Sequence, residues 1–142
     1  MDIFRSLKVS SSGLAAHRRW LDTIASNLAN ARATRTPEGG PYRRRDPVFR
    51  AESPGENAPG SPPDPARTGV KVTEIAVDPS PPNLVYEPGH PDANAEGYVA
   101  YPNVSIPEEM TNMIAASRSY EANLQAFNAF KTMAMRTLDL FR

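Results

Sequence analysis

Apolar residues recur every three or four positions along the last part of the chain. Stepping alternately by four and three residues gives a set of positions that is mostly apolar: Ile106, Met110, Met113, Ser117, Tyr120, Leu124, Phe127, Lys131, Ala134, Leu138 and Phe141. A repeat of about 3.5 residues over this length is typical of a helix that buries one narrow stripe against a partner helix. The sequence therefore predicts a helix over residues 106–141.

The beginning of the chain has the same pattern. The corresponding positions are Ile3, Leu7, Ser10, Leu14, His17, Leu21, Ile24, Leu28 and Ala31. This predicts a helix over residues 2–31, which ends before Thr36 because the residue that precedes a proline disfavours helical geometry. We expect a mainly α fold in which two long terminal helices pair as a coiled coil.

The middle of the chain, residues 32–105, has a different composition. It holds nearly all of the fifteen prolines and predicts short β-strands joined by turns. Extended segments are expected at residues 42–49, 70–77, 83–86 and 96–101. The apolar alternation changes phase between Val72 and Ile75, which indicates a bulge there or burial on both faces. Residues 52–68 are poor in apolar groups and are expected to form a flexible loop. Three parts follow: the helix at 1–31, the extended middle at 32–105 and the helix at 106–142.

The composition narrows the function classes. Sixteen basic residues balance sixteen acidic ones, so no bulk charge attracts nucleic acid or an anionic membrane. The chain has no cysteine and hence no thiolate metal site. The first nine residues include Asp2, Arg5 and Lys8 without an apolar run, so we expect no cleaved secretory signal.

The sequence offers little chemistry for catalysis. The two histidines, His17 and His90, have no second ligand at metal spacing, and no phosphate loop or nucleophile elbow is present. His17 lies on the apolar stripe, where we expect a polar residue that fixes the register of the helices or packs half-buried. Glu108 and Glu109 are expected to be first-turn charges at the positive end of the last helix. We expect no enzyme activity, no cofactor and no small-molecule substrate.

Several features favour assembly with other chains. Two helices would bury only their shared stripes, and apolar groups beyond those stripes call for further partners. Asn27, Asn30 and Asn123 are candidates to hydrogen-bond across helix contacts, although an ordinary solvated surface is the simpler interpretation. The candidate assembly residues are Leu7, Leu14, Trp20, Leu21, Ile24, Asn27, Leu28, Asn30, Met110, Met113, Ile114, Tyr120, Asn123, Leu124, Phe127, Phe130 and Leu138. The basic run Arg43, Arg44 and Arg45 is a candidate charge patch for docking onto an acidic neighbour.

Motifs at both ends resemble a known family. SNLANA at residues 26–31, preceded by SGL at 12–14, resembles the N-terminal signature of bacterial flagellar rod and hook proteins. EPGHP at 87–91, EGYV at 96–99, YPNV at 101–104 and ASRSYEAN at 116–123 narrow the resemblance to the proximal rod of that family. The resemblance covers both helices and most of the middle.

The resemblance implies a structural subunit of the proximal rod of the flagellar basal body, part of the drive shaft and export channel. Such subunits assemble helically through their terminal helices in the periplasm, after export by the flagellar type III apparatus. The implied partners are other copies of the chain, the rod proteins FlgB, FlgF and FlgG, and FliE.

Two alternatives stay open at this stage. Within the family, the chain could be FlgB-like, although the EPGHP and YPNV segments disfavour this. Outside the family, a coiled-coil adaptor or export chaperone would use the proline-rich middle to bind peptide-recognition domains. Deletion of residues 1–31 separates the classes, because a rod subunit would lose assembly whereas an adaptor would keep binding through its middle.

Overall fold

The chain begins and ends with a long helix, and four short strands lie between these helices in the sequence. A computed structural model describes residues 3–52 and 69–140. The order is α1 (Ile3–Ala29), β1 (Arg45–Glu52), β2 (Gly69–Val77), β3 (Asn83–Tyr86), β4 (Tyr98–Tyr101) and α2 (Ile106–Leu140). The predicted mainly α class with a strand-containing middle is confirmed.

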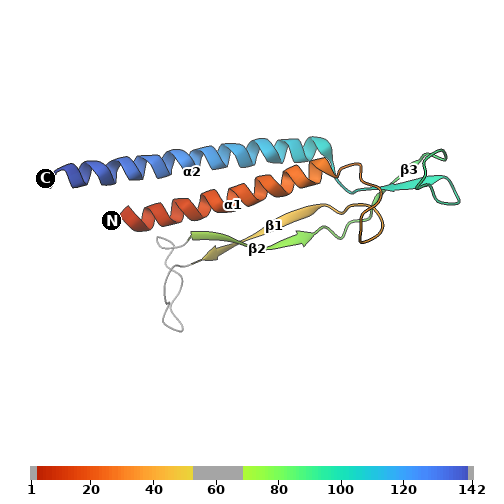
Figure 1. Cartoon of the computed structure of the whole chain (residues 1–142), viewed down its shortest axis with the longest axis horizontal. Coiled ribbons are helices and arrows are strands. Elements are labelled where there is room, and N and C mark those ends of the chain that lie inside the picture. Colours follow the sequence, from red (N-terminus) through yellow and green to blue (C-terminus); the bar gives the residue numbers. More distant parts are fainter. Residues whose placement is uncertain (1–2, 53–68, 141–142) are drawn as a thin grey trace, which may run out of the picture.

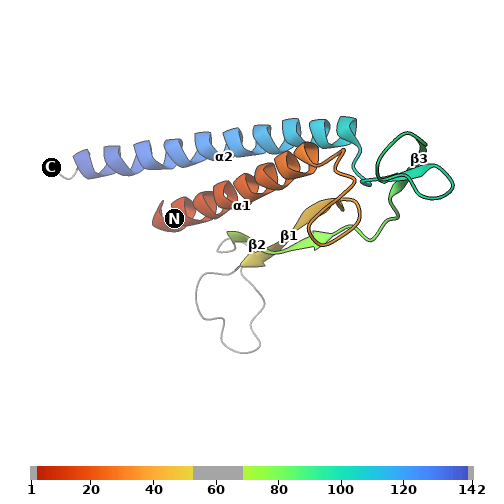
Figure 2. The ribbon, with the colours of Figure 1, turned by 45° about the vertical axis from the view of Figure 1, so that its right-hand side comes forward.

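The elements form three layers along one axis. Figure 1 shows α1 and α2 side by side and running in opposite directions, with the β1–β2 ribbon on the other face of α1. The turned view of Figure 2 keeps this order, so α1 is the middle layer. The β3–β4 hairpin lies beyond the end of the layers where α1 finishes and α2 begins.

The strands form two separate antiparallel pairs. β1 pairs with β2, and β3 pairs with β4. In the first pair Val48 lies opposite Glu74 and Phe49 opposite Val72, which leaves Thr73 as the extra residue of a bulge. Of the two alternatives for the segment between Val72 and Ile75, the bulge is therefore confirmed.

Most predicted strand positions are confirmed, with shifts at the ends. The second and third predicted strands match β2 and β3, and the fourth is shortened to β4. The segment predicted at 42–49 begins later, at Arg45, and continues to Glu52. Its start is delayed because Tyr42 is held in the turn that follows α1, where its N–H donates to the carbonyl oxygen of Ala33 at 3.0 Å. The loop predicted at 52–68 lies outside the described residues, except that Glu52 ends β1.

Glycine is required at the end of the hairpin. Gly97 has φ +84°, a conformation that side chains rarely adopt, and a Cβ there would lie 2.9 Å from Cε2 of Tyr86. Its N–H donates to Asn94, and its carbonyl oxygen accepts from the N–H of Glu87 at 2.9 Å. The turn between β3 and β4 is thus closed by backbone bonds that only glycine accommodates without strain.

The predicted stripe on α2 is half correct. Met113, Tyr120, Phe127 and Ala134 are at least half-buried, but five other predicted positions are exposed: Ile106, Met110, Leu124, Lys131 and Leu138. The buried line instead includes Glu109, Ala116, Asn123 and Phe130, each one residue earlier than the prediction. The repeat of about 3.5 residues is retained, but its phase differs at every second position.

Close approach of the helices explains this shift. Ala116 is fully buried, and a Cβ added at Gly13 of α1 would lie 3.3 Å from the amide group of Asn123. Small residues at such positions let two helix backbones come near each other. A prediction from hydrophobicity alone selects the larger apolar residues next to these positions. The two helices lie too close together to accommodate such side chains.

Enlarging Ala116 should separate the helices. We expect Ala116→Leu to destabilise the chain by about 1–3 kcal/mol, because overpacking forces backbone or rotamer shifts. Ala115→Leu is the matched control: Ala115 is exposed, so the change should stay within about 0.5 kcal/mol. Urea unfolding followed by circular dichroism measures both, and equal losses in the two variants would contradict the packing described here.

Candidate functional site

A buried polar cluster joins the three layers at the end where α1 finishes. Its centre is Asn27 of α1, which has no exposed surface. The Asn27 Nδ2 group donates to Glu109 Oε2 of α2 at 2.9 Å and to the carbonyl oxygen of Arg45 in β1 at 2.8 Å. Its Oδ1 atom accepts from the Arg45 N–H at 3.0 Å and from the hydroxyl of Tyr42 at 2.9 Å. One amide therefore bridges helix, helix and strand with all four bonds made.

Glu109 is the second member of the cluster and is 1% exposed. Its Oε1 atom accepts from Arg44 Nε at 2.8 Å, so the buried carboxylate has both a countercharge and an amide donor. A buried charge without such partners would be strongly unfavourable.

Arg44 connects this carboxylate to two aspartates. Its Nη1 atom pairs with Asp46 and lies 3.9 Å from an Asp78 carboxylate oxygen. Burial opposes the charge of Arg44, but the hydrogen bond to Glu109 and the charges of Asp46 and Glu109 outweigh this and raise its pKa. Burial also raises the pKa of Asp46, against the lowering effect of Arg44. The Arg44 N–H donates to Asn103 Oδ1 at 2.9 Å, which ties the start of β1 to the segment before α2.

Glu108 and Glu109 both lie in the first turn of α2, as expected. Glu109 is in addition a buried ion-pair partner, whereas Glu108 is exposed. Within the basic run, the guanidinium of Arg44 is engaged inside the chain, while Arg43 and Arg45 are exposed. The signal that could have identified the cluster is Asn27 at a helix position that otherwise favours apolar residues.

An aromatic cluster lies further toward the start of α1. His17 and Trp20 of α1 pack around Phe49 of β1, with ring centroids 6.0–6.4 Å apart. His17 is half-buried, as expected, and its Nδ1 atom is buried without a hydrogen-bond partner among the described residues. Burial lowers the pKa of His17. Trp20 thus contacts its own chain rather than standing free on the surface.

The candidate assembly residues fall into three classes. Ile24 and Asn27 are buried. The half-buried ones are Leu7, Leu14, Trp20, Leu21, Leu28, Asn30, Met113, Tyr120, Asn123, Phe127 and Phe130. The exposed ones are Met110, Ile114, Leu124 and Leu138, all on α2. The exposed class is the one available to a partner without any change in the chain.

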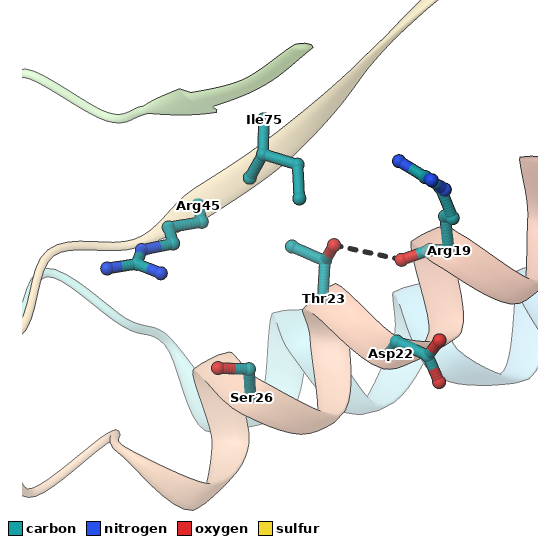
Figure 3. Close-up of a pocket in the computed structure, with 6 residues that line it drawn as sticks. All are labelled: Arg19, Asp22, Thr23, Ser26, Arg45 and Ile75. Atoms are coloured by element: carbon teal, nitrogen blue, oxygen red, sulfur yellow. Dashed lines mark hydrogen bonds between the residues drawn. The ribbon is translucent and has the colours of Figure 1, made fainter. Parts of the chain in front are cut away.

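A groove lies between α1 and the β1–β2 ribbon. Its volume is about 300 Å³. Figure 3 shows Arg19 and Arg45 at its two ends, with Ile75 opposite the helix and the hydroxyl groups of Thr23 and Ser26 beneath. Thr23 donates to the Arg19 carbonyl oxygen at 2.9 Å, which leaves the oxygen lone pairs of its hydroxyl as acceptors.

The described residues do not form a centre for metal chemistry. No three histidine, aspartate or glutamate side chains within the described ranges lie close enough together to hold a metal ion. Neither described helix combines the length and apolar character that crossing a bilayer needs.

Comparisons with known proteins point to one family. Residues 7–34 match the model for "Flagella basal body rod protein", and residues 95–140 match that for "Flagellar basal body rod FlgEFG protein C-terminal". The chain is 43% identical to the flagellar basal-body rod protein FlgC of Salmonella typhimurium, over 99% of this chain and 98% of the relative. It is 45% identical to FlgC of Bacillus subtilis, over 99% of each chain. FlgC of Borreliella burgdorferi is 42% identical, over 100% of this chain and 99% of the relative.

Removal of Glu109 tests the polar cluster. We expect Glu109→Ala to destabilise the chain by about 3–5 kcal/mol, because it leaves Arg44 and Asn27 without their buried partner. Glu108→Ala is the matched control, since that carboxylate is exposed, and it should change stability by less than about 1 kcal/mol. Both values come from denaturant unfolding, and a Glu109 variant as stable as the Glu108 variant would refute the role assigned to the cluster.

His17 should make stability depend on pH. The pKa of His17 is lowered in the folded chain, so the unfolded chain binds its proton first as pH falls. Stability should therefore be greatest above about pH 6.5 and should decline below it, through the lowered pKa of the folded state. Trp20 is the single tryptophan and contacts the imidazole, so its fluorescence reports unfolding of this region. In His17→Phe the loss of stability between about pH 7.5 and 5.5 should be smaller than in the original chain. An equal loss of stability in both would contradict this assignment.

Proposed function

The chain belongs to the FlgC family of flagellar basal-body rod proteins, and we propose that it builds the proximal rod by helical assembly through its terminal helices. Its place is the flagellar basal body, and its role is structural. The expectation of a proximal rod subunit is confirmed, and the relatives carry the FlgC name rather than FlgB. Their identity as rod proteins also removes the reason to keep the adaptor or chaperone alternative.

The observation that supports the proposed mode of assembly is the exposure of apolar residues on the outer face of α2. Met110 and Ile114 are 55% and 57% exposed, and Leu138 is 71% exposed. Apolar groups left open along a helix of 35 residues favour burial against another chain. A surface of this kind that meets a different surface on the next copy gives an open helical array rather than a closed ring.

The pairing of α1 and α2 supplies the unit that assembles. We infer that the two helices act as a coiled-coil domain at 1–31 and 106–142, with the extended middle at 32–105 packed outside it. The antiparallel contact of the two helices and its repeat of about 3.5 residues support this. Within the unit, Asn27 has the role of fixing the register of the helices, because its hydrogen bonds lie inside the chain.

We assign three sets of partners by family. The first is other copies of the chain, and the second is the proteins FlgB, FlgF, FlgG and FliE; both sets would contact the exposed faces. The third is the flagellar type III export apparatus, which would deliver the chain to the periplasm. The exposed Arg43 and Arg45 suit docking onto an acidic neighbour. Buried Ile24 and Asn27 would support the interface from inside.

Charge on the outer face of α2 tests this proposal. The double variant Met110→Glu, Ile114→Glu should abolish swimming in a strain that lacks its own FlgC, because burying two unpaired carboxylates is strongly unfavourable. Its helix content should stay close to that of the original chain, since both side chains are exposed. Thr111→Glu, Ala115→Glu is the matched control on exposed positions with little apolar surface. Normal swimming of the Met110, Ile114 variant would refute the proposed role of this face.

A further inference from the structure

The β3–β4 hairpin presents an unusual amount of apolar surface. Every residue of β3 is exposed, with Leu84 at 65% and Tyr86 at 63%. Tyr98 of β4 stacks edge-to-face on Tyr86 with ring centroids 5.3 Å apart. Figures 1 and 2 show the hairpin standing clear of the layered helices and ribbon. An isolated two-stranded hairpin is marginal in water, so these side chains call for a surface that covers them.

The hairpin also carries negative charge at its turn. Glu87 and Glu96 flank the turn and are exposed. Asp92, the third carboxylate of this region, is already engaged by Thr34 and Arg35. Glu87 Oε2 accepts from the Tyr101 hydroxyl at 3.0 Å, which orients its carboxylate and leaves Oε1 available. The free charges are thus two carboxylates beside an apolar and aromatic strand face.

The groove between α1 and the ribbon has the complementary composition. Arg19 and Arg45 stand at its ends, and neither guanidinium makes a salt bridge among the described residues. Ile75, 47% exposed, gives the groove an apolar wall. The acidic Asp22 also lines the groove, so two arginines and one aspartate leave the groove with a net positive charge. The two arginines on either side of Ile75 thus complement the two exposed glutamates beside the apolar strand β3.

We propose that the β3–β4 hairpin of one copy docks into the α1–ribbon groove of a second copy of this chain. Leu84 and Tyr86 cover Ile75, while Glu87 and Glu96 pair with Arg19 and Arg45. The contact joins two different surfaces, so it repeats from copy to copy and does not close on itself. This inference deepens the proposed function and rests on it: it names the contact by which successive rod subunits engage.

The second copy is the occupant that the geometry favours. In Figure 1 the hairpin extends away from the ribbon along the long axis of its own chain, so it does not fill its own groove. The groove and the hairpin carry opposite charge in a chain whose net charge is zero. A second copy provides both the apolar and the acidic elements at once.

Charge exchange tests the pairing. Arg19→Glu with Arg45→Glu should abolish swimming in a strain that lacks its own FlgC, because like charges would then face each other. Adding Glu87→Arg and Glu96→Arg to that variant should restore swimming at least partly. Arg18→Glu with Arg50→Glu is the matched control, because these arginines are exposed on the same two elements but do not line the groove. Normal swimming of the groove variant, or loss in the four-residue variant equal to that in the groove variant, would overturn the pairing.

Crosslinking tests the contact directly. The chain has no cysteine, so Ile75→Cys with Leu84→Cys adds one thiol to the groove and one to the hairpin. A short bismaleimide applied to swimming cells should give dimers and a ladder of larger species. Ile75→Cys with Met133→Cys, an exposed position on α2, should not. No ladder from the first pair, or equal ladders from both, would overturn the inference while leaving the rod function standing. Failure of the original chain to restore swimming would instead overturn the rod function and this inference together.

Discussion

The structure depends on a hydrogen bond between one buried amide and one buried carboxylate. Asn27 and Glu109 come from opposite ends of the sequence, and their bond at 2.9 Å fixes where α2 begins along α1. The same amide holds the main chain of Arg45, so the β1–β2 ribbon is located by the same group. A buried polar group that loses its hydrogen bonds is costly, which makes this arrangement of the three layers more favourable than slipped alternatives.

This constraint explains why a chain with a small apolar core presents large surfaces. The buried apolar residues are few, and several are as small as Ala16, Ala31 and Ala116. The larger apolar groups of α2, the ribbon and the hairpin are left partly open. In the proposed assembly these open faces are the contact surfaces, and the polar cluster keeps them in fixed positions relative to one another.

The periodicity of the sequence was sufficient to predict both helices and most of the strands, because burial of one face leaves a regular pattern. The periodicity did not predict which positions of α2 are buried or that Glu109 is one of them, since both depend on which residues of α1 lie opposite α2. Gly13 leaves room for Asn123, and Asn27 supplies a donor for Glu109, and neither pairing can be read from one helix alone. The ion pair of Arg44 with Glu109 was not predicted for the same reason, because the two residues meet only when the chain folds. The groove beside Ile75 was not predicted, as it arises from two elements far apart in the sequence.

The most direct test of this account is a double-mutant cycle between Asn27 and Glu109. The free energy of unfolding would be measured for the original chain, Asn27→Ala, Glu109→Ala and the double variant. If the two side chains hold the layers together as a unit, the effects will fall short of additivity by about 1–3 kcal/mol. Additive effects, within about 0.5 kcal/mol, would show that the two residues act independently and would contradict the account.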